Sequence, residues 1–127
     1  MLFVEWLDPL MPGGLWVPEQ IAFAGGRSLL TEPGRHSTPH ELSTLVRLNP
    51  DAILLGPCGY TTERTRAELD TLTNLPGWDS VTAVQEDRVW IVDGPAYFNR
   101  PGPRVVDGAE QIAVLLAGGI TGVGSLP

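Results

Sequence analysis

The sequence predicts an α/β fold, a three-layer sandwich in which a small, mostly parallel sheet is flanked by helices. Short apolar runs of strand type alternate with segments of helical periodicity, the order expected of a layered α/β domain. The continuous run at residues 51–56 is bounded by Pro50 and Pro57, as is typical of a strand covered on both faces. We expect residues 1–117 to form a single lobe and the glycine-rich residues 118–127 to form a flexible tail.

The N-terminal third predicts one strand and one helix. The apolar run at residues 2–6 has strand character, and residues 7–17 form a loop rich in proline and glycine. Pro18 is well placed as the first residue of a short helix over residues 19–24, which Gly25 ends. Residues 27–37 show no period and are expected to be a loop.

The middle of the chain carries a strong helix-start pattern. Thr38 is a suitable N-cap, Pro39 suits the first helical position, and Glu41 follows three residues after the cap. The pattern predicts a helix from Thr38 that ends before Asn49 and precedes the strand at residues 51–56.

The remaining elements follow from periodicity. Thr61 or Thr62 is expected to cap a helix that runs to residue 75. Residues 81–84 and 88–92 are expected to be a short and a longer strand, and residues 104–117 have the apolar spacing of an amphipathic helix.

The composition is acidic and globular. Hydrophobic residues make up 43% of the chain, charged residues 18%, and the formal net charge is −7, with arginine as the only basic residue type besides histidine. Nucleic acid and anionic membrane surfaces are therefore poor partners. The apolar run at the N-terminus is interrupted by Glu5 and Asp8, so no signal peptide is recognised, and a complete chain of this kind would be cytoplasmic.

The motifs of common enzymes and metal sites are missing. His36, His40 and Cys58 are the only soft or borderline metal ligands, and their spacing matches no metal motif. A nucleophile pair of Cys58 and His36 is conceivable, but no acid–base partner stands at a motif spacing. There is no dinucleotide fingerprint and no phosphate-binding loop. We therefore expect no catalysis, no metal and no cofactor.

The loops at the carboxyl ends of the strands hold the most distinctive residues. Ligands of such sheets lie beyond these ends, where residues 7–17, 57–60 and 93–103 would meet. The last loop combines prolines, glycines, aromatics and arginines, so composition favours a stiff turn and a binding platform equally.

Aromatic residues on these loops suit a large flat ligand. Trp16, Tyr60 and Phe98 could stack on it, and Arg100 could donate hydrogen bonds to its carbonyls or carboxylates. Trp78 and Trp90, by contrast, are assigned to the core.

Several runs together carry a family resemblance that extends to about Leu116. They are Val4–Pro9, Gly14–Glu19 with Ala24–Gly26, Asn49–Ile53, Pro57–Tyr60 and Tyr97–Arg104. These runs resemble the C-terminal lobe of the substrate-binding proteins of ABC importers, particularly the cobalamin and iron-siderophore branch.

The resemblance implies a single lobe of a periplasmic-binding-protein-like fold that binds a ligand without catalysis. Members have two lobes joined by a long rigid helix, hold the ligand in the cleft between them and deliver it to an ABC permease. It implies a periplasmic or extracytoplasmic location, and a missing N-terminal lobe. The ligand-binding residues it suggests are Asp8, Trp16, Cys58, Tyr60, Tyr97, Phe98, Asn99 and Arg100.

The resemblance also implies a transporter-docking glutamate at the start of the helix before the strand at residues 51–56. The aligned positions carry Ser43 and Thr44, and Glu41 lies slightly earlier. Glu41 has two interpretations, docking and helix capping.

Two functions stay open at this point. The first is a lobe that binds a corrinoid such as cobalamin, although haem and siderophores suit the same aromatics and arginine. The second is an orphan lobe that has become a homodimeric interaction module and no longer binds a corrinoid.

Overall fold

The computed structural model describes residues 1–99 and 102–118, and in this part of the chain it contains one four-stranded sheet in the order β2-β1-β3-β4. The strands are β1 (Leu2–Trp6), β2 (Met11–Pro12), β3 (Ile53–Leu55) and β4 (Val89–Ile91). β1, β3 and β4 are parallel, and β2 is an antiparallel edge strand. The predicted α/β fold with a mostly parallel sheet is confirmed.

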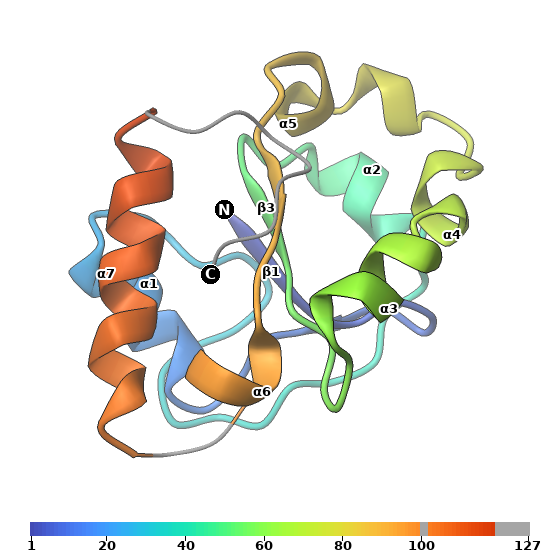
Figure 1. Cartoon of the computed structure of the whole chain (residues 1–127). Helices are drawn as coiled ribbons and strands as arrows, with labels where there is room; N and C mark the ends of the chain where they lie inside the picture. Colours follow the sequence, from blue (N-terminus) through green and yellow to red (C-terminus); the bar gives the residue numbers. More distant parts are fainter. Residues whose placement is uncertain (100–101, 119–127) are drawn as a thin grey trace.

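Helices cover both faces of the sheet, as Figure 1 shows. One layer contains α1 (Val17–Phe23), α6 (Gly94–Tyr97) and α7 (Arg104–Leu116). The other contains α2 (Thr44–Leu48), α3 (Thr62–Ala67), α4 (Asp70–Thr73), the 3₁₀ helix η1 (Trp78–Ser80) and α5 (Thr82–Gln85). In the described part of the chain, no helix combines the length and apolar character needed to cross a membrane.

The alternation of side chains along the strands builds two cores. Leu2 and Val4 point into the core beneath α2–α5, whereas Phe3 points into the core beneath α1 and α7. β3 and β4 repeat this division, with Leu54 and Trp90 on the side of Phe3. Because all three strands are buried on both faces, they read as continuous apolar runs.

Several sequence predictions are confirmed. β1, β3, β4, α1 and α7 lie at the expected positions, and Trp78 and Trp90 are core residues, 7% and 1% exposed. Thr61 rather than Thr62 is the N-cap of α3, since its hydroxyl accepts a hydrogen bond from the backbone N–H of Arg64 at 3.1 Å.

The helix predicted from Thr38 is wrong at its start. His40 pairs with Leu10 in an isolated antiparallel bridge, so a tertiary contact holds this residue outside any helix. The helix begins only at Thr44, and Glu41 does not occupy a capping position. α2 ends before Asn49, as predicted, and Asn49 adopts the left-handed conformation common at helix C-termini.

Two further predictions need correction. Residues 81–84 are not a strand, because Val81 ends η1 and residues 82–85 form α5. Val81 and Ala83 are both buried and lie two positions apart. This is the spacing of buried residues along a strand, so the sequence pattern resembles one. The single helix predicted up to residue 75 is two short helices, α3 and α4.

Candidate ligand-binding site

The loops that follow the parallel strands meet at one edge of the sheet. In Figure 1 this edge lies at the bottom, where α6 and the start of α3 come together. We call the surface formed by residues 7–16, 57–61 and 93–99 the carboxyl-end face. It is the location at which parallel α/β sheets bind their ligands.

Two cavities open on this face, one on each side of the end of β1. Glu5 lines a cavity of about 290 Å³ that contains Trp16, the Trp16 cavity. Trp6 lines a cavity of about 250 Å³ that contains Tyr60, the Tyr60 cavity. Successive residues of a strand point to opposite sides, so the two cavities flank a single strand end.

The Trp16 cavity combines an aromatic wall with polar groups. Its other walls include Met11, His36, Ser37 and Asn99. The indole Nε1–H of Trp16 donates to the backbone carbonyl of Phe98 at 2.5 Å, which ties the ring to the loop after β4. The cavity therefore offers an amide, an imidazole and a hydroxyl beside a large aromatic surface.

The carboxylate of Glu5 joins two loops of the face. Oε2 accepts a hydrogen bond from the backbone N–H of Gly14 at 3.3 Å, and Oε1 accepts one from the thiol of Cys58 at 3.4 Å. The segment between β2 and α1 and the loop after β3 are thus held by one side chain. Sequence reasoning missed this role, although a carboxylate inside an apolar strand was the signal for it.

Two glycines allow the loops of the face to approach closely. A Cβ at Gly14 would lie 2.6 Å from the backbone nitrogen of Ser37. A Cβ at Gly94 would lie 2.4 Å from the carbonyl oxygen of Gly56 and 2.6 Å from Nδ2 of Asn99. Any side chain at either position would push neighbouring loops apart.

Cys58 is a protonated thiol at neutral pH. Burial, followed by the charge of Glu5 and the hydrogen bond to it, raises the pKa of the Cys58 thiol to about 11. The thiolate is the nucleophilic form, so this environment disfavours the nucleophilic role considered for Cys58. His36 lines the Trp16 cavity, whereas Cys58 is not among the residues that line it.

The Tyr60 cavity is built from stacked rings and charges. The rings of Trp6 and Tyr60 meet edge to face with centroids 5.2 Å apart, and the guanidinium of Arg64 lies 3.9 Å from the Tyr60 centroid. The hydrogen bond to Glu68, with some desolvation, raises the pKa of Tyr60, although the charge of Arg64 opposes the shift. Asp8 is exposed and lines this cavity, as does Glu68.

The loop after β4 departs from the predicted platform. It contains the short helix α6, capped by Asp93, whose Oδ1 accepts from the backbone N–H of Ala96 at 2.9 Å. Phe98 is only 1% exposed and packs on Phe3, with ring centroids 4.9 Å apart. Its ring is therefore a core side chain, while Phe98 is also one of the residues that line the Trp16 cavity, and its role toward a ligand stays a prediction.

Tyr97 and Asn99 point to different surroundings. The hydroxyl of Tyr97 accepts from Arg104 at 2.6 Å, and Tyr97 lines neither cavity of the face. Asn99 lines the Trp16 cavity, and its Nδ2 donates to the carbonyl of Gly56 at 3.5 Å. Arg100 lies outside the described residues.

Two sequence predictions remain, the docking glutamate and the absence of a metal site. Glu41 is exposed ahead of α2, and its carbonyl accepts from the backbone N–H of Thr44 at 2.9 Å. Within residues 1–99 and 102–118, no group of three or more metal-binding side chains comes together. The structure thus adds Trp6, Glu5 and His36 to the predicted residues around the two cavities.

No protein-family model matches this sequence, and neither does any curated protein. Solved structures do match its fold. An ABC-type Fe³⁺-hydroxamate transport protein from Saccharomonospora viridis has a TM-score of 0.72 and 21% identity over 91% of this chain and 40% of its own. The periplasmic vitamin B12 binding protein BtuF of Vibrio cholerae has a TM-score of 0.67 and 20% identity, over 91% and 43%.

A periplasmic heme binding protein from Pseudomonas aeruginosa gives a similar result. Its TM-score is 0.68 and its identity 24%, over 89% of this chain and 40% of its own. The chain therefore spans less than half the length of the structures it matches. In fold, it is a single lobe of the kind found in the periplasmic substrate-binding proteins of ABC importers.

Proposed function

We propose that this chain is the non-catalytic ligand-binding lobe of an importer substrate-binding protein, with the carboxyl-end face as its ligand wall. The observation that carries the proposal is the pair of aromatic-lined cavities on either side of the end of β1. They lie where parallel sheets bind ligands, and the matching structures are named for Fe³⁺-hydroxamate, vitamin B12 and heme.

The ligand class is a large, mostly flat chelate, with cobalamin as the first candidate. Trp16 supplies an aromatic surface, and Asn99 and His36 supply hydrogen-bonding groups beside it. Asp8 and Tyr60 extend the wall across the second cavity. Cys58 supports the face through Glu5, and Arg100 remains a proposed ligand residue from the sequence.

Delivery of such a ligand requires an ABC permease in an extracytoplasmic setting. Glu41 is exposed and free of the capping role, which supports the proposal that it docks to basic residues of the permease. A Glu41→Gln variant is expected to bind the ligand normally and to weaken association with the permease. Equal permease association of both proteins would remove Glu41 from the proposal.

The experiment that tests the function is a titration of the purified chain with cobalamin, hemin and a ferric hydroxamate by isothermal calorimetry. One chelate is expected to bind with a Kd of about 1–100 µM, weaker than in a two-walled cleft because one wall buries less of the ligand. Trp16→Ala should lower the affinity, whereas truncation of an exposed aromatic elsewhere, Phe23→Ala, should not. Absence of binding by all three chelates at about 1 mM would exclude the proposal.

The alternative, a homodimeric interaction module, predicts a dimer that binds no chelate. A dimer indifferent to every chelate in sedimentation experiments would favour it. A chelate-dependent dimer would instead show that a second copy supplies the opposing wall.

A further inference from the structure

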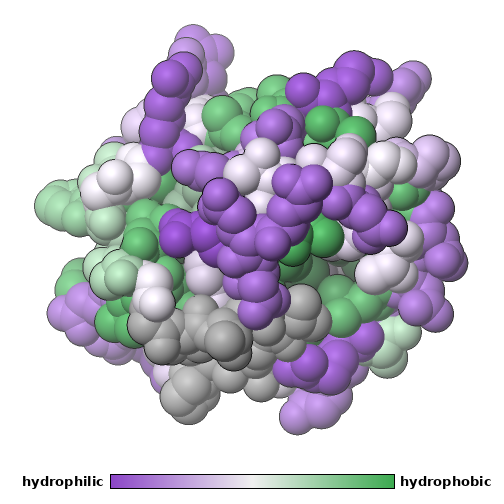
Figure 2. All heavy atoms as spheres, turned by 90° about the horizontal axis from the view of Figure 1, so that it is seen from above, coloured by the Kyte–Doolittle hydropathy of each residue, from purple (hydrophilic) through white to green (hydrophobic). Residues whose placement is uncertain are grey.

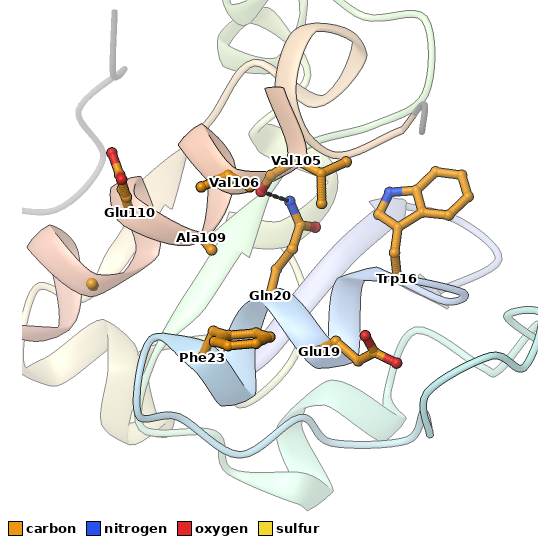
Figure 3. Close-up of a pocket in the computed structure, with 9 residues that line it drawn as sticks. Trp16, Glu19, Gln20, Phe23, Val105, Val106, Ala109 and Glu110 are labelled. Carbon is orange, nitrogen blue, oxygen red and sulfur yellow. Dashed lines mark hydrogen bonds between the residues drawn. The ribbon is translucent and has the colours of Figure 1, made fainter. Parts of the chain in front are cut away.

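A second cavity system lies away from the ends of the strands, between α1 and α7. This α1–α7 groove has a volume of about 350 Å³. Its walls are Trp16 and Phe23 on one side and Val105, Val106, Ala109 and Ala113 on the other. Figure 3 shows the two helices as its walls, with Gln20 reaching across from α1. Apart from Trp16, these residues do not line the cavities of the carboxyl-end face.

The rim of the groove exposes large apolar side chains. Phe23 is 87% exposed and Val106 is 63% exposed. Figure 2 shows apolar residues on the side of the molecule where α1 and α7 lie, among hydrophilic neighbours. An apolar groove with a polar surround is typical of a protein interaction site.

The buried amide of Gln20 is incompletely satisfied. Gln20 is 2% exposed, and its Nε2 donates to the carbonyls of Tyr97 at 3.0 Å and Val105 at 2.8 Å. These two acceptors fix the amide orientation, since a flipped amide would set oxygen against two carbonyl oxygens. Oε1 is therefore an acceptor between the helices, and in the described part of the chain it has no hydrogen-bond partner.

Charge at the groove has one sign. Glu19 on α1 and Glu110 on α7 are exposed, and they are the charged residues among the described lining residues. An occupant with basic residues on its flanks would be attracted to both walls and would discriminate against acidic helices.

We propose that the α1–α7 groove docks an amphipathic helix of a partner, with an apolar stripe flanked by lysine or arginine. The wall from Val105 to Ala113 extends for about 12 Å at 1.5 Å per residue, or about two helical turns, which matches anchors at positions i, i+3 or i+4, and i+7. The apolar stripe covers Phe23 and Val106, and the basic flanks meet Glu19 and Glu110.

The test measures fluorescence anisotropy of a labelled helical peptide of about 15 residues, with leucine at the anchor positions and lysine flanks. A matched peptide carries glutamate in place of each lysine. We expect the lysine peptide to bind and the glutamate peptide to bind at least about tenfold more weakly.

Two exposed valines of α7 provide the matched protein variants. Val106 lines the groove, whereas Val114 is 54% exposed and is not one of the lining residues. Val106→Ser should weaken peptide binding by about tenfold, and Val114→Ser should leave it unchanged. Both variants should fold normally because both side chains are on the surface.

Three results would overturn the proposal. They are no binding of either peptide at about 1 mM, equal loss with both valine variants, and a Val106-dependent dimer of the chain in the absence of peptide. The last would assign the groove to a second copy. The readout contains no chelate, so its outcome is independent of the proposed function.

Discussion

The carboxyl-end face and the α1–α7 groove belong to one lobe but are built in opposite ways. The face consists of loops from three strands, held together by Glu5 and by close approaches at Gly14 and Gly94. The groove consists of two helices with small or aliphatic walls and one buried amide. The face therefore suits a ligand that is oriented by polar groups, and the groove suits a partner that is held by apolar contact.

The largest expected effect tests the core that supports both regions. Phe98→Ala removes a ring that packs on Phe3 and should lower the free energy of unfolding by about 3–5 kcal/mol. Chemical denaturation measures this change. Trp16→Ala truncates a half-buried ring. Compared with Phe98→Ala, it should lower the free energy of unfolding less and weaken chelate binding more. The reverse ranking would make Phe98 a ligand residue after all.

The second prediction concerns Glu5, whose substitution should affect the carboxyl-end face and leave the α1–α7 groove unchanged. Glu5→Gln keeps the size of the side chain but places an amide where Gly14 N–H and the Cys58 thiol both donate, so one contact is lost. The expected destabilisation is about 1–3 kcal/mol in denaturant titration. The affinity of the groove for the lysine peptide should not change. If the groove also lost affinity for the lysine peptide, Glu5 would support the lobe as a whole.

Cys58 should contribute about 1 kcal/mol to the pH dependence of stability. Its pKa is raised to about 11 in the folded state, so the folded state holds the proton more tightly than the unfolded chain does. The stabilisation is complete below the ordinary thiol pKa and is lost as the pH rises toward 11. The side chain is partly exposed, so the full shift is discounted for solvent screening.

Thermal unfolding between about pH 8 and 11 checks this expectation. Tyr60, whose pKa is also raised, contributes at the upper end of the range. Comparison with Cys58→Ser isolates the thiol, because serine does not titrate there. Identical pH profiles of the two proteins would contradict the linkage.

The smallest effect concerns the helix beside the Tyr60 cavity. Thr61→Ala removes the N-cap of α3 and should cost about 0.5–1 kcal/mol, whereas Thr62→Ala removes no cap. Denaturation of both variants measures the difference. Neither variant should change the affinity of the α1–α7 groove for the lysine peptide. A larger cost for Thr62→Ala would mean that the cap has been assigned to the wrong threonine.

Sequence patterns predicted the elements whose formation is decided locally. The strands at β1, β3 and β4 are buried on both faces, and α7 has a clear apolar stripe, so their residues alone indicate their structure. The start pattern at Thr38 failed because His40 pairs with Leu10, a contact that no local pattern reports. Tertiary pairing overrode a favourable capping sequence.

The candidate site was predictable as a location and less so as a set of residues. The topological rule places it at the carboxyl ends, and Trp16, Tyr60, Asp8 and Asn99 do line its cavities. Phe98 also lines the Trp16 cavity, but the sequence did not indicate that its ring is buried, because adjacent aromatics at a short helix point to different sides. Glu5 was missed because a single carboxylate in a strand gains its role only when two distant loops donate to it.

Trp16 lines both the Trp16 cavity and the α1–α7 groove. One indole ring is therefore a common wall between a site proposed for a chelate and a site proposed for a helix. A ligand that repositions this ring on one side changes the shape offered on the other. The two binding equilibria are then thermodynamically linked, and the linkage is reciprocal: whatever factor the chelate imposes on helix affinity, the helix imposes on the chelate.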